Sequence, residues 1–379
     1  MFSFVNPSPI TALHPPVPNF TIIPLPFFLI HPKPNNCFTF LMTAQKNIHL
    51  ANKYTLLDKL YSLMGYLTFL ICTPIIYHIK IFKEKKGFHT MKLRKTIGRI
   101  LVCLLPFLLA FALQFLISFG GIFVRIMLAA LKDPGLLKGE ELYSTIFALT
   151  SDSQFLAGVS ALYAVIAALI MGFWYWKRFV PKKRPRRKIS SIINLSMFFG
   201  LLFLMIGLQY LTTYIVMLTT AVNPSWYDIY EALLKNIGFE DVTLILALYS
   251  VLIAPISEEL IFRGVTLKYA VNSMPLIAAN IFQAALFGIF HGNVIQGVYA
   301  FVIGLFCGYV CLKGGSIYLS ILFHMMFNLW GTFVPSFLYY TGPSLPIHLG
   351  IFAGAVCAAA LGIFLYQRGI RNRKASGKS

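Results

Sequence analysis

Two adjacent glutamates, Glu258 and Glu259, lie within an apolar run that extends from Val242 to Val271. An ionised side chain at the centre of a bilayer costs about 3 kcal/mol or more. On a helix, Glu259 and Arg263 share one face with the acid on the N-terminal side, which favours an ion pair. Glu258 points about 100° away and has no such local partner. We therefore expect Glu259 and Arg263 to form a structural pair and Glu258 to carry the function.

The composition of the chain excludes an ordinary soluble domain. Of 379 residues, 58% are hydrophobic and 12% are charged, which leaves too little polar surface for a water-soluble fold. Nine apolar segments are each near the roughly 20 residues that a spanning helix needs. We predict an all-α fold, a polytopic membrane helical bundle with about nine transmembrane helices. The segments are Leu60–Ile79, Ile100–Val124, Gln154–Trp176, Ile189–Ala221, Val242–Val271, Pro275–His291, Ile295–Leu312, Ser316–Val334 and Pro346–Tyr366.

Basic residues gather in three clusters, Lys80–Arg99, Lys177–Lys188 and Arg368–Lys378, which account for much of the net charge of +20. On a polar fold such clusters would suggest nucleic-acid binding, but beside membrane segments they mark cytoplasmic ends. We expect them to contact membrane lipids and no nucleic acid. The chain is predicted to be an integral plasma-membrane protein with a cytoplasmic C-terminus. Its Lys- and Phe-rich composition favours a bacterial source.

The same topology sets the sides of two connections and of the N-terminus. The acidic loop Asn223–Asp241 falls outside. The turn His291–Asn293 falls outside as well, and nine spans place the N-terminus outside. The N-terminal residues 1–55, rich in proline, are predicted to be a disordered or non-native leader. Residues 56–241 are expected to form the N-terminal transmembrane helices, 242–335 a catalytic core, and 336–379 the last helix and a basic tail.

Six cysteines are scattered in or beside the apolar segments, and no two of them form a C-x-x-C pair. We predict that they are small buried apolar residues and that they form neither a disulfide framework nor a zinc ribbon. They are Cys37, Cys72, Cys103, Cys307, Cys311 and Cys357.

Four polar residues of the C-terminal half, Glu258, His291, His324 and Asn328, are predicted to lie at similar depths in the bilayer. At about 1.5 Å of rise per residue, all four fall in a slab roughly 12 Å thick. Antiparallel helices can therefore bring them together, and polar groups in lipid need such partners. The predicted turns between these helices lie at Asn272–Ser273, His291–Asn293 and Lys313–Gly315.

A carboxylate with two histidines and an amide suits the activation of a water molecule. Glu258 would be the general base and later the acid to the leaving amine, and Pro255 is predicted to kink its helix and admit water. His291 and His324 could bind a divalent metal such as zinc, which would polarise the substrate carbonyl. Without a metal, one histidine would orient the water while His324 and the Asn328 amide stabilise the oxyanion. The residues alone leave both possibilities open.

Three short motifs resemble those of one known family. Residues 258–263 read E-E-L-I-F-R, 287–291 read F-G-I-F-H, and 324–328 read H-M-M-F-N. They are similar to the E-E-x-x-x-R, F-x-x-x-H and H-x-x-x-N motifs of the CPBP family, in the same order. This family comprises CAAX prenyl endopeptidases and the bacteriocin-processing or bacteriocin-immunity proteins also called Abi.

The resemblance implies an intramembrane endopeptidase, described for this family both as a metalloprotease and as a metal-free glutamate protease. The substrate would be a peptide or a membrane-protein segment. The runner-up is a non-proteolytic bacteriocin-immunity or scaffold protein of the same family, and a proton-coupled transporter is a third class. Prenyl endopeptidases act on cytosolic tails, whereas the predicted topology opens this site toward the outer face. The implied site residues are Glu258, Glu259, Arg263, His291, His324 and Asn328.

Overall fold

The computed structural model describes residues 89–133, 135, 142–182, 192–334 and 344–376. The chain divides into two units, Met1–Lys86 and Gly87–Ser379, and every described residue lies in the second. The predicted leader at 1–55 and the first predicted span, Leu60–Ile79, therefore lie outside the described residues. Within the described ranges all regular structure is helical and no strand occurs. The prediction of an all-α polytopic bundle is confirmed.

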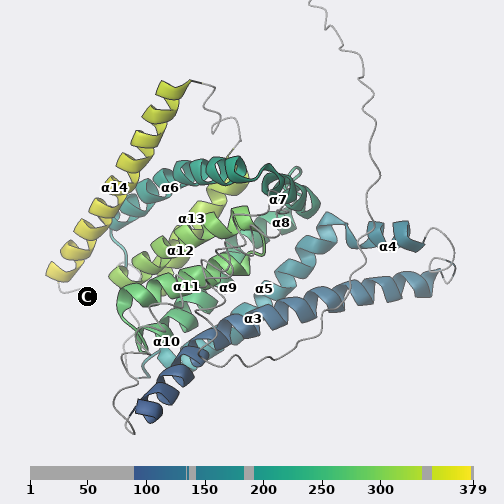
Figure 1. Cartoon of the computed structure of the whole chain (residues 1–379), viewed down its shortest axis with the longest axis horizontal. Helices are drawn as coiled ribbons and strands as arrows, with labels where there is room; N and C mark the ends of the chain where they lie inside the picture. Colours follow the sequence, from purple (N-terminus) through teal and green to yellow (C-terminus); the bar gives the residue numbers. More distant parts are fainter. Residues whose placement is uncertain (1–88, 134, 136–141, 183–191, 335–343, 377–379) are drawn as a thin grey trace, which may run out of the picture. The chain divides into compact units, whose positions relative to one another are not determined.

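Helices α3 to α14, with two π-helical turns named η3 and η4, make up the described fold (Figure 1). Their bounds are α3 His89–Lys132, α4 Leu142–Thr150, α5 Ser153–Phe179, α6 Leu195–Val222, α7 Pro224–Ile237, α8 Leu244–Leu248, η3 Tyr249–Ile253, α9 Ala254–Glu259, η4 Leu260–Thr266, α10 Leu267–Val271, α11 Leu276–Phe290, α12 Val294–Gly314, α13 Ile317–Phe333 and α14 Leu345–Ala375.

Six stretches of the described chain are long and apolar enough to cross a membrane. They are Gly98–Lys132, Ser153–Phe179, Leu195–Val222, Leu244–Val271, Val294–Gly314 and Leu345–Ala375. Two further predicted spans form shorter apolar helices, α11 and α13, of 15 and 17 residues. The predicted number of nine spans is therefore not confirmed. The motif histidines belong to these two short helices: His291 directly follows α11, and His324 lies within α13.

Local capping explains where the helices of the C-terminal half begin and end. Asn194 accepts a hydrogen bond from the Met197 amide at 2.9 Å, so α6 begins later than the predicted Ile189. Asn293 caps α12 in the same way, and Gly315 ends it with a left-handed φ of 69° that favours glycine. The three predicted turns are present between α10 and α11, α11 and α12, and α12 and α13.

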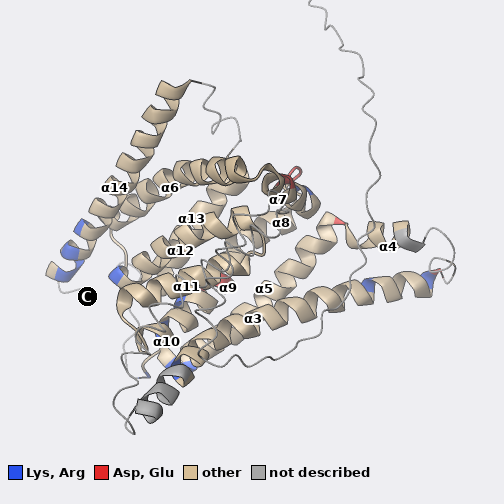
Figure 2. Cartoon of the chain, viewed as in Figure 1, with Lys and Arg blue, Asp and Glu red and all other residues tan. Residues whose placement is uncertain are grey.

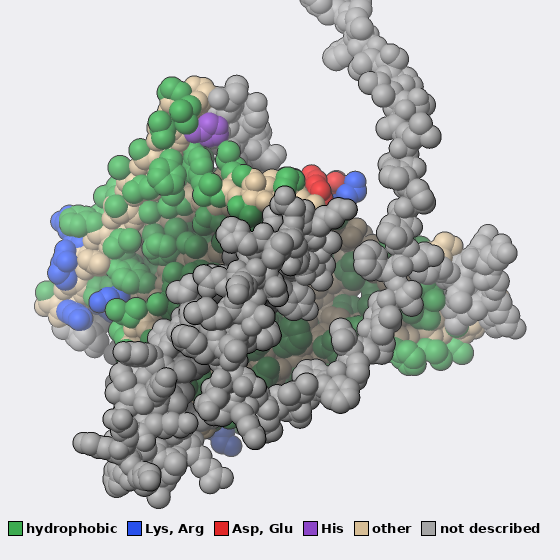
Figure 3. Space-filling model, in the orientation of Figure 1, with side chains coloured by type: hydrophobic (Ala, Val, Ile, Leu, Met, Phe, Trp, Pro, Cys, Tyr) green, Lys and Arg blue, Asp and Glu red, His purple; other side chains and the backbone are tan. Residues whose placement is uncertain are grey.

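The central helices α9, α11, α12 and α13 lie between two flanking pairs, α6 with α14 and α3 with α5 (Figure 1). One buried apolar cluster joins α6, α12, α13 and α14. A second joins α3, α5, η4 and α11. Hydrophobic side chains cover much of the described surface seen in Figure 3. The exposed hydrophobic residues of α3 include Phe115, Leu116 and Phe123. Such a surface suits lipid and not water.

Glycines let α6 and α14 approach at backbone distance. A Cβ added at Gly207 would lie 2.6 Å from the Ala359 amide nitrogen, and one at Gly200 would lie 2.5 Å from the Tyr366 amide nitrogen. Gly362 faces Leu204 in the same manner. Small residues at such crossings permit the close van der Waals packing that drives helix association in membranes.

We therefore expect Gly207→Ala to destabilise the bundle by about 1–3 kcal/mol, because the new methyl group meets backbone that cannot move aside. The measurement is the midpoint of heat-induced loss of the monodisperse protein in detergent. Gly354→Ala is the matched control on α14, since a Cβ there meets nothing within 4 Å and alanine favours a helix. Equal midpoints for the two variants would refute the close-packing account.

Candidate active site

The two glutamates lie on α9, a short helical segment with a π-helical turn on each side, η3 and η4. At the end of η3, the Ala254 amide donates to the Tyr249 carbonyl five residues earlier. Pro255, where a kink was predicted, follows directly in the first turn of α9. Such π-turns are rare and are found mostly at functional sites. In Figure 2 the acidic residues of α9 stand among uncharged central helices.

The predicted pair of Glu259 and Arg263 is present, with 2.7 Å between the Arg263 Nη1 and Glu259 Oε1 atoms. Both side chains are fully buried. Arg263 also donates from Nη2 to the Gly304 carbonyl of α12 at 3.1 Å, and its guanidinium lies 4.5 Å from the centre of the Phe287 ring. These contacts compensate part of the cost of burying the charge. The pair thus fixes α9 and η4 against α11 and α12.

His324 on α13 lies between the two glutamates. Its Nδ1 is 2.9 Å from Glu259 Oε1, and its Nε2 is 3.6 Å from Glu258 Oε2. Because the Glu259 carboxylate paired with Arg263 can only accept, Nδ1 carries the proton of this hydrogen bond. A neutral His324 ring then presents an Nε2 lone pair toward Glu258, whose side chain is 16% exposed. One water molecule can donate a hydrogen bond to each of these two acceptors.

His291 follows the last residue of α11 and is held by its own helix. Its Nδ1 lies 2.8 Å from the Phe287 carbonyl, so Nδ1 donates and a neutral ring again leaves Nε2 free. His291 also interacts electrostatically with Glu258 and His324. The buried Phe287 ring packs edge-on against both histidines, with centroid distances of 4.8 Å to His291 and 5.7 Å to His324. Phe287 thereby spaces the two imidazoles.

Asn328 lies one turn beyond His324 on α13 and binds the helix of the glutamates. Its Nδ2 donates to the Ser250 carbonyl in η3 at 2.8 Å, and the Ser250 and Thr332 hydroxyls are 3.3 Å apart. The π-turn frees this carbonyl from the regular helical pattern. One of the two N–H groups of the Asn328 amide therefore holds α13 to η3, and no described residue accepts a hydrogen bond from the second.

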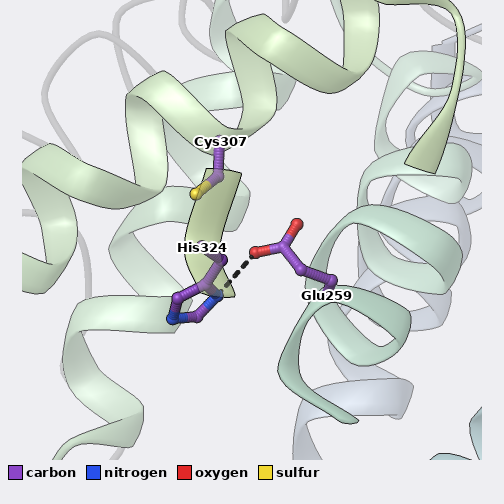
Figure 4. A group of neighbouring side chains, drawn as sticks. All are labelled: Glu259, Cys307 and His324. Atoms are coloured by element: carbon purple, nitrogen blue, oxygen red, sulfur yellow. Dashed lines mark hydrogen bonds and ion pairs between the residues drawn. The ribbon is translucent and has the colours of Figure 1, made fainter. Parts of the chain in front are cut away.

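Cys307 on α12 joins the site, although the sequence indicated only a small buried apolar residue. Figure 4 shows Cys307, Glu259 and His324, with the hydrogen bond between the last two dashed. Their potential ligand atoms all lie within 4.8 Å of one another, and all three residues are buried. A cysteine inside an apolar helix carries no sequence signal for such a role.

The Cys307 cluster is compact enough for a metal ion, but its charges oppose one. The Glu259 oxygen already receives the Arg263 guanidinium and the His324 N–H. A cation there would have to displace that proton and lie beside a buried positive charge. His291, the other predicted metal ligand, does not belong to this group. These contacts count against a metal ion in the Cys307 cluster.

Comparison with known proteins gives one match. Residues 240–330 match the model of a family described as Rce1-like, type II CAAX prenyl endopeptidase. No curated protein and no solved structure matches the chain. The matched segment overlaps the predicted core at 242–335 and contains all three motifs. The resemblance is thus confirmed for this part of the chain: segment 240–330 matches the Rce1-like model of type II CAAX prenyl endopeptidases.

Proposed function

We propose that this chain is an intramembrane endopeptidase that uses Glu258 to activate water. The observation that carries the proposal is the approach of Glu258 Oε2 to His324 Nε2 at 3.6 Å inside an apolar bundle. In the proposed resting state His324 is neutral and Glu258 is ionised, so that both atoms accept hydrogen bonds from one water molecule. The family match of residues 240–330 supports a peptidase over a transporter.

In the proposed reaction, Glu258 takes a proton from the water as the oxygen attacks the scissile carbonyl carbon. The water oxygen forms the new C–O bond, and the carbonyl π electrons move to the oxygen. Collapse of this tetrahedral intermediate breaks the C–N bond, and Glu258 returns the proton to the leaving nitrogen. The water donates its second hydrogen bond to the free Nε2 of His324, with the free Nε2 of His291 as the alternative acceptor, and the second N–H of Asn328 stabilises the oxyanion.

Glu259 and Arg263 act in this scheme as positioning residues. The hydrogen bond from His324 Nδ1 to Glu259 selects the tautomer with a free Nε2. Arg263 keeps Glu259 ionised so that it remains an acceptor. A carboxylate that accepts a hydrogen bond from the other ring nitrogen often holds a functional histidine in one orientation.

The proposed mechanism is glutamate-dependent and uses no metal. The purified chain is treated with a chelator such as EDTA, and bound cations are then removed. We expect its rate of reporter-peptide cleavage to stay within about twofold of the untreated rate. The physical reason is that Glu259 already accepts hydrogen bonds from the Arg263 guanidinium and from the His324 Nδ1–H. Loss of activity on chelation and its recovery with zinc would instead support a metallopeptidase.

A lipidated C-terminal peptide is the proposed substrate class, on the strength of the family match. The test compares a fluorogenic peptide that carries a farnesylated CAAX end with the same peptide lacking the lipid. Faster cleavage of the farnesylated peptide supports the class, whereas equal rates favour a general membrane peptide.

We further propose a bacterial plasma membrane and a cytoplasmic C-terminus from the basic clusters. In this proposed topology the site lies nearer the outer face, whereas prenyl endopeptidases act on cytosolic tails, so a preference for the farnesylated peptide would count against the topology.

The second candidate is a non-proteolytic immunity protein of the same family. It is favoured if Glu258→Ala and His291→Ala still protect cells fully against a bacteriocin. The engaged hydrogen bonds of both histidines favour the enzyme, because they hold the ring tautomers that water activation requires.

A further inference from the structure

Tyr163 on α5 is a buried tyrosine whose hydroxyl has no hydrogen-bond partner among the described residues. The residue is 5% exposed. A buried donor left unpaired costs about 1–3 kcal/mol. Native structures keep few such groups unless a water molecule or a ligand supplies the partner. The Tyr163 hydroxyl therefore points to a partner that arrives from outside the protein.

The surroundings of Tyr163 place it beside the candidate active site. Tyr163 belongs to the buried apolar cluster that also contains Phe287, and Tyr249 of η3 packs against the same cluster. The Tyr163 ring lies 6.5 Å from that of Phe290, the residue before His291. Helix α5 packs directly against η3 and α9. A helix outside the matched segment 240–330 thus brings a hydroxyl group to the site.

The proposed peptidase reaction lacks a second oxyanion donor among its motif residues. The Nδ1–H groups of His291 and His324 are directed to Phe287 and Glu259, so neither neutral ring offers an N–H to a substrate. Asn328 has one N–H engaged by Ser250 and can supply one donor. Oxyanion sites of acyl transfer are built from preorganised donors around the carbonyl oxygen.

We propose that the Tyr163 hydroxyl is a catalytic hydrogen-bond donor to the carbonyl oxygen of the scissile peptide, opposite the water held by Glu258. This inference rests on the proposed endopeptidase function. Tyr163 keeps its proton throughout, because it only donates a hydrogen bond to the oxygen on which negative charge develops. The water proton passes to Glu258 and then to the leaving nitrogen. The unpaired hydroxyl of the substrate-free protein is the group that the substrate satisfies.

The test is Tyr163→Phe, which removes only the hydroxyl and keeps the ring packed against Phe290. We expect kcat for a farnesylated reporter peptide to fall about 100-fold, with KM and the pH profile unchanged. Thermal stability should be equal to or above that of the wild type, since an unpaired buried hydroxyl is lost. Tyr175→Phe is the control: it lies on the same helix twelve residues away, about 18 Å along the axis, and should retain wild-type kcat.

Three outcomes overturn the inference. A kcat of Tyr163→Phe within twofold of wild type would show that the hydroxyl takes no part in the reaction. A fall in kcat with a displaced acidic limb of the pH profile means that Tyr163 acts on Glu258 and not on the carbonyl. Absence of wild-type cleavage refutes the endopeptidase itself, and the Glu258→Gln variant run in parallel separates this case from failure of the Tyr163 assignment alone.

Discussion

Arg263→Met should abolish stable folding of the purified chain or lower its unfolding free energy by about 3–5 kcal/mol. The substitution leaves the Glu259 carboxylate fully buried without its 2.7 Å partner. It also removes the hydrogen bond to the Gly304 carbonyl and the contact with the Phe287 ring. The measurement is the yield of monodisperse protein in detergent and its midpoint of heat denaturation.

The double variant Glu259→Gln with Arg263→Met should recover most of that loss. A neutral amide no longer requires a buried cation, and its oxygen still accepts from His324 Nδ1. Arg125→Met is the control, because its pair with Asp152 is 26% and 41% exposed and such pairs contribute about 0–1 kcal/mol. A stable single variant, or a double variant no better than the single one, would contradict the account of the pair.

Glu258→Gln should lower kcat by at least about 100-fold and up to about 10,000-fold, the range typical of a lost general acid or base. The amide has nearly the same shape but cannot accept the proton of the water. Folding should be retained, because Glu258 is not one of the groups that hold Arg263. Cleavage of the reporter peptide and the thermal midpoint are measured on the same preparation.

Glu240→Gln is the matched control for this substitution. Glu240 pairs with Lys235 at the surface, where the two side chains are 66% and 67% exposed, so kcat should not change. A Glu258→Gln protein that cleaves at the wild-type rate would show that another group activates the water. A Glu258→Gln protein that unfolds would show that Glu258 is structural.

Local patterns predicted the elements of the site that depend on neighbouring residues. The four-residue spacing of Glu259 and Arg263 predicted their ion pair, and the turns predicted at His291–Asn293 and Lys313–Gly315 lie at the two ends of α12. Apolar length predicted the bundle and placed α11 and α13 to within one residue at each end. The two helices are slightly shorter than the predicted spans because Pro275 and Ser316 are their N-caps and His291 and Val334 their C-caps.

The remaining features depend on contacts between distant helices, which local patterns do not encode. Asn328 binds a carbonyl that a π-turn makes available, and nothing in the composition of 249–253 signals that turn. Cys307 has the sequence context of a packing residue, yet it faces Glu259 and His324. Tyr163 comes from α5, nearly a hundred residues before Glu258. Only the packing of α5 against α9 brings Tyr163 near the site, and the sequence does not show this packing.

The central claim is that Glu258 activates water for peptide hydrolysis, and mass spectrometry of the products tests it most directly. Purified full-length chain is incubated with the farnesylated reporter peptide in ¹⁸O-labelled water, beside its Glu258→Gln variant. The account predicts two products from the wild type, with one ¹⁸O atom in the new carboxylate, and intact peptide from the variant. Intact peptide with the folded wild type, or labelled products with Glu258→Gln, would contradict it.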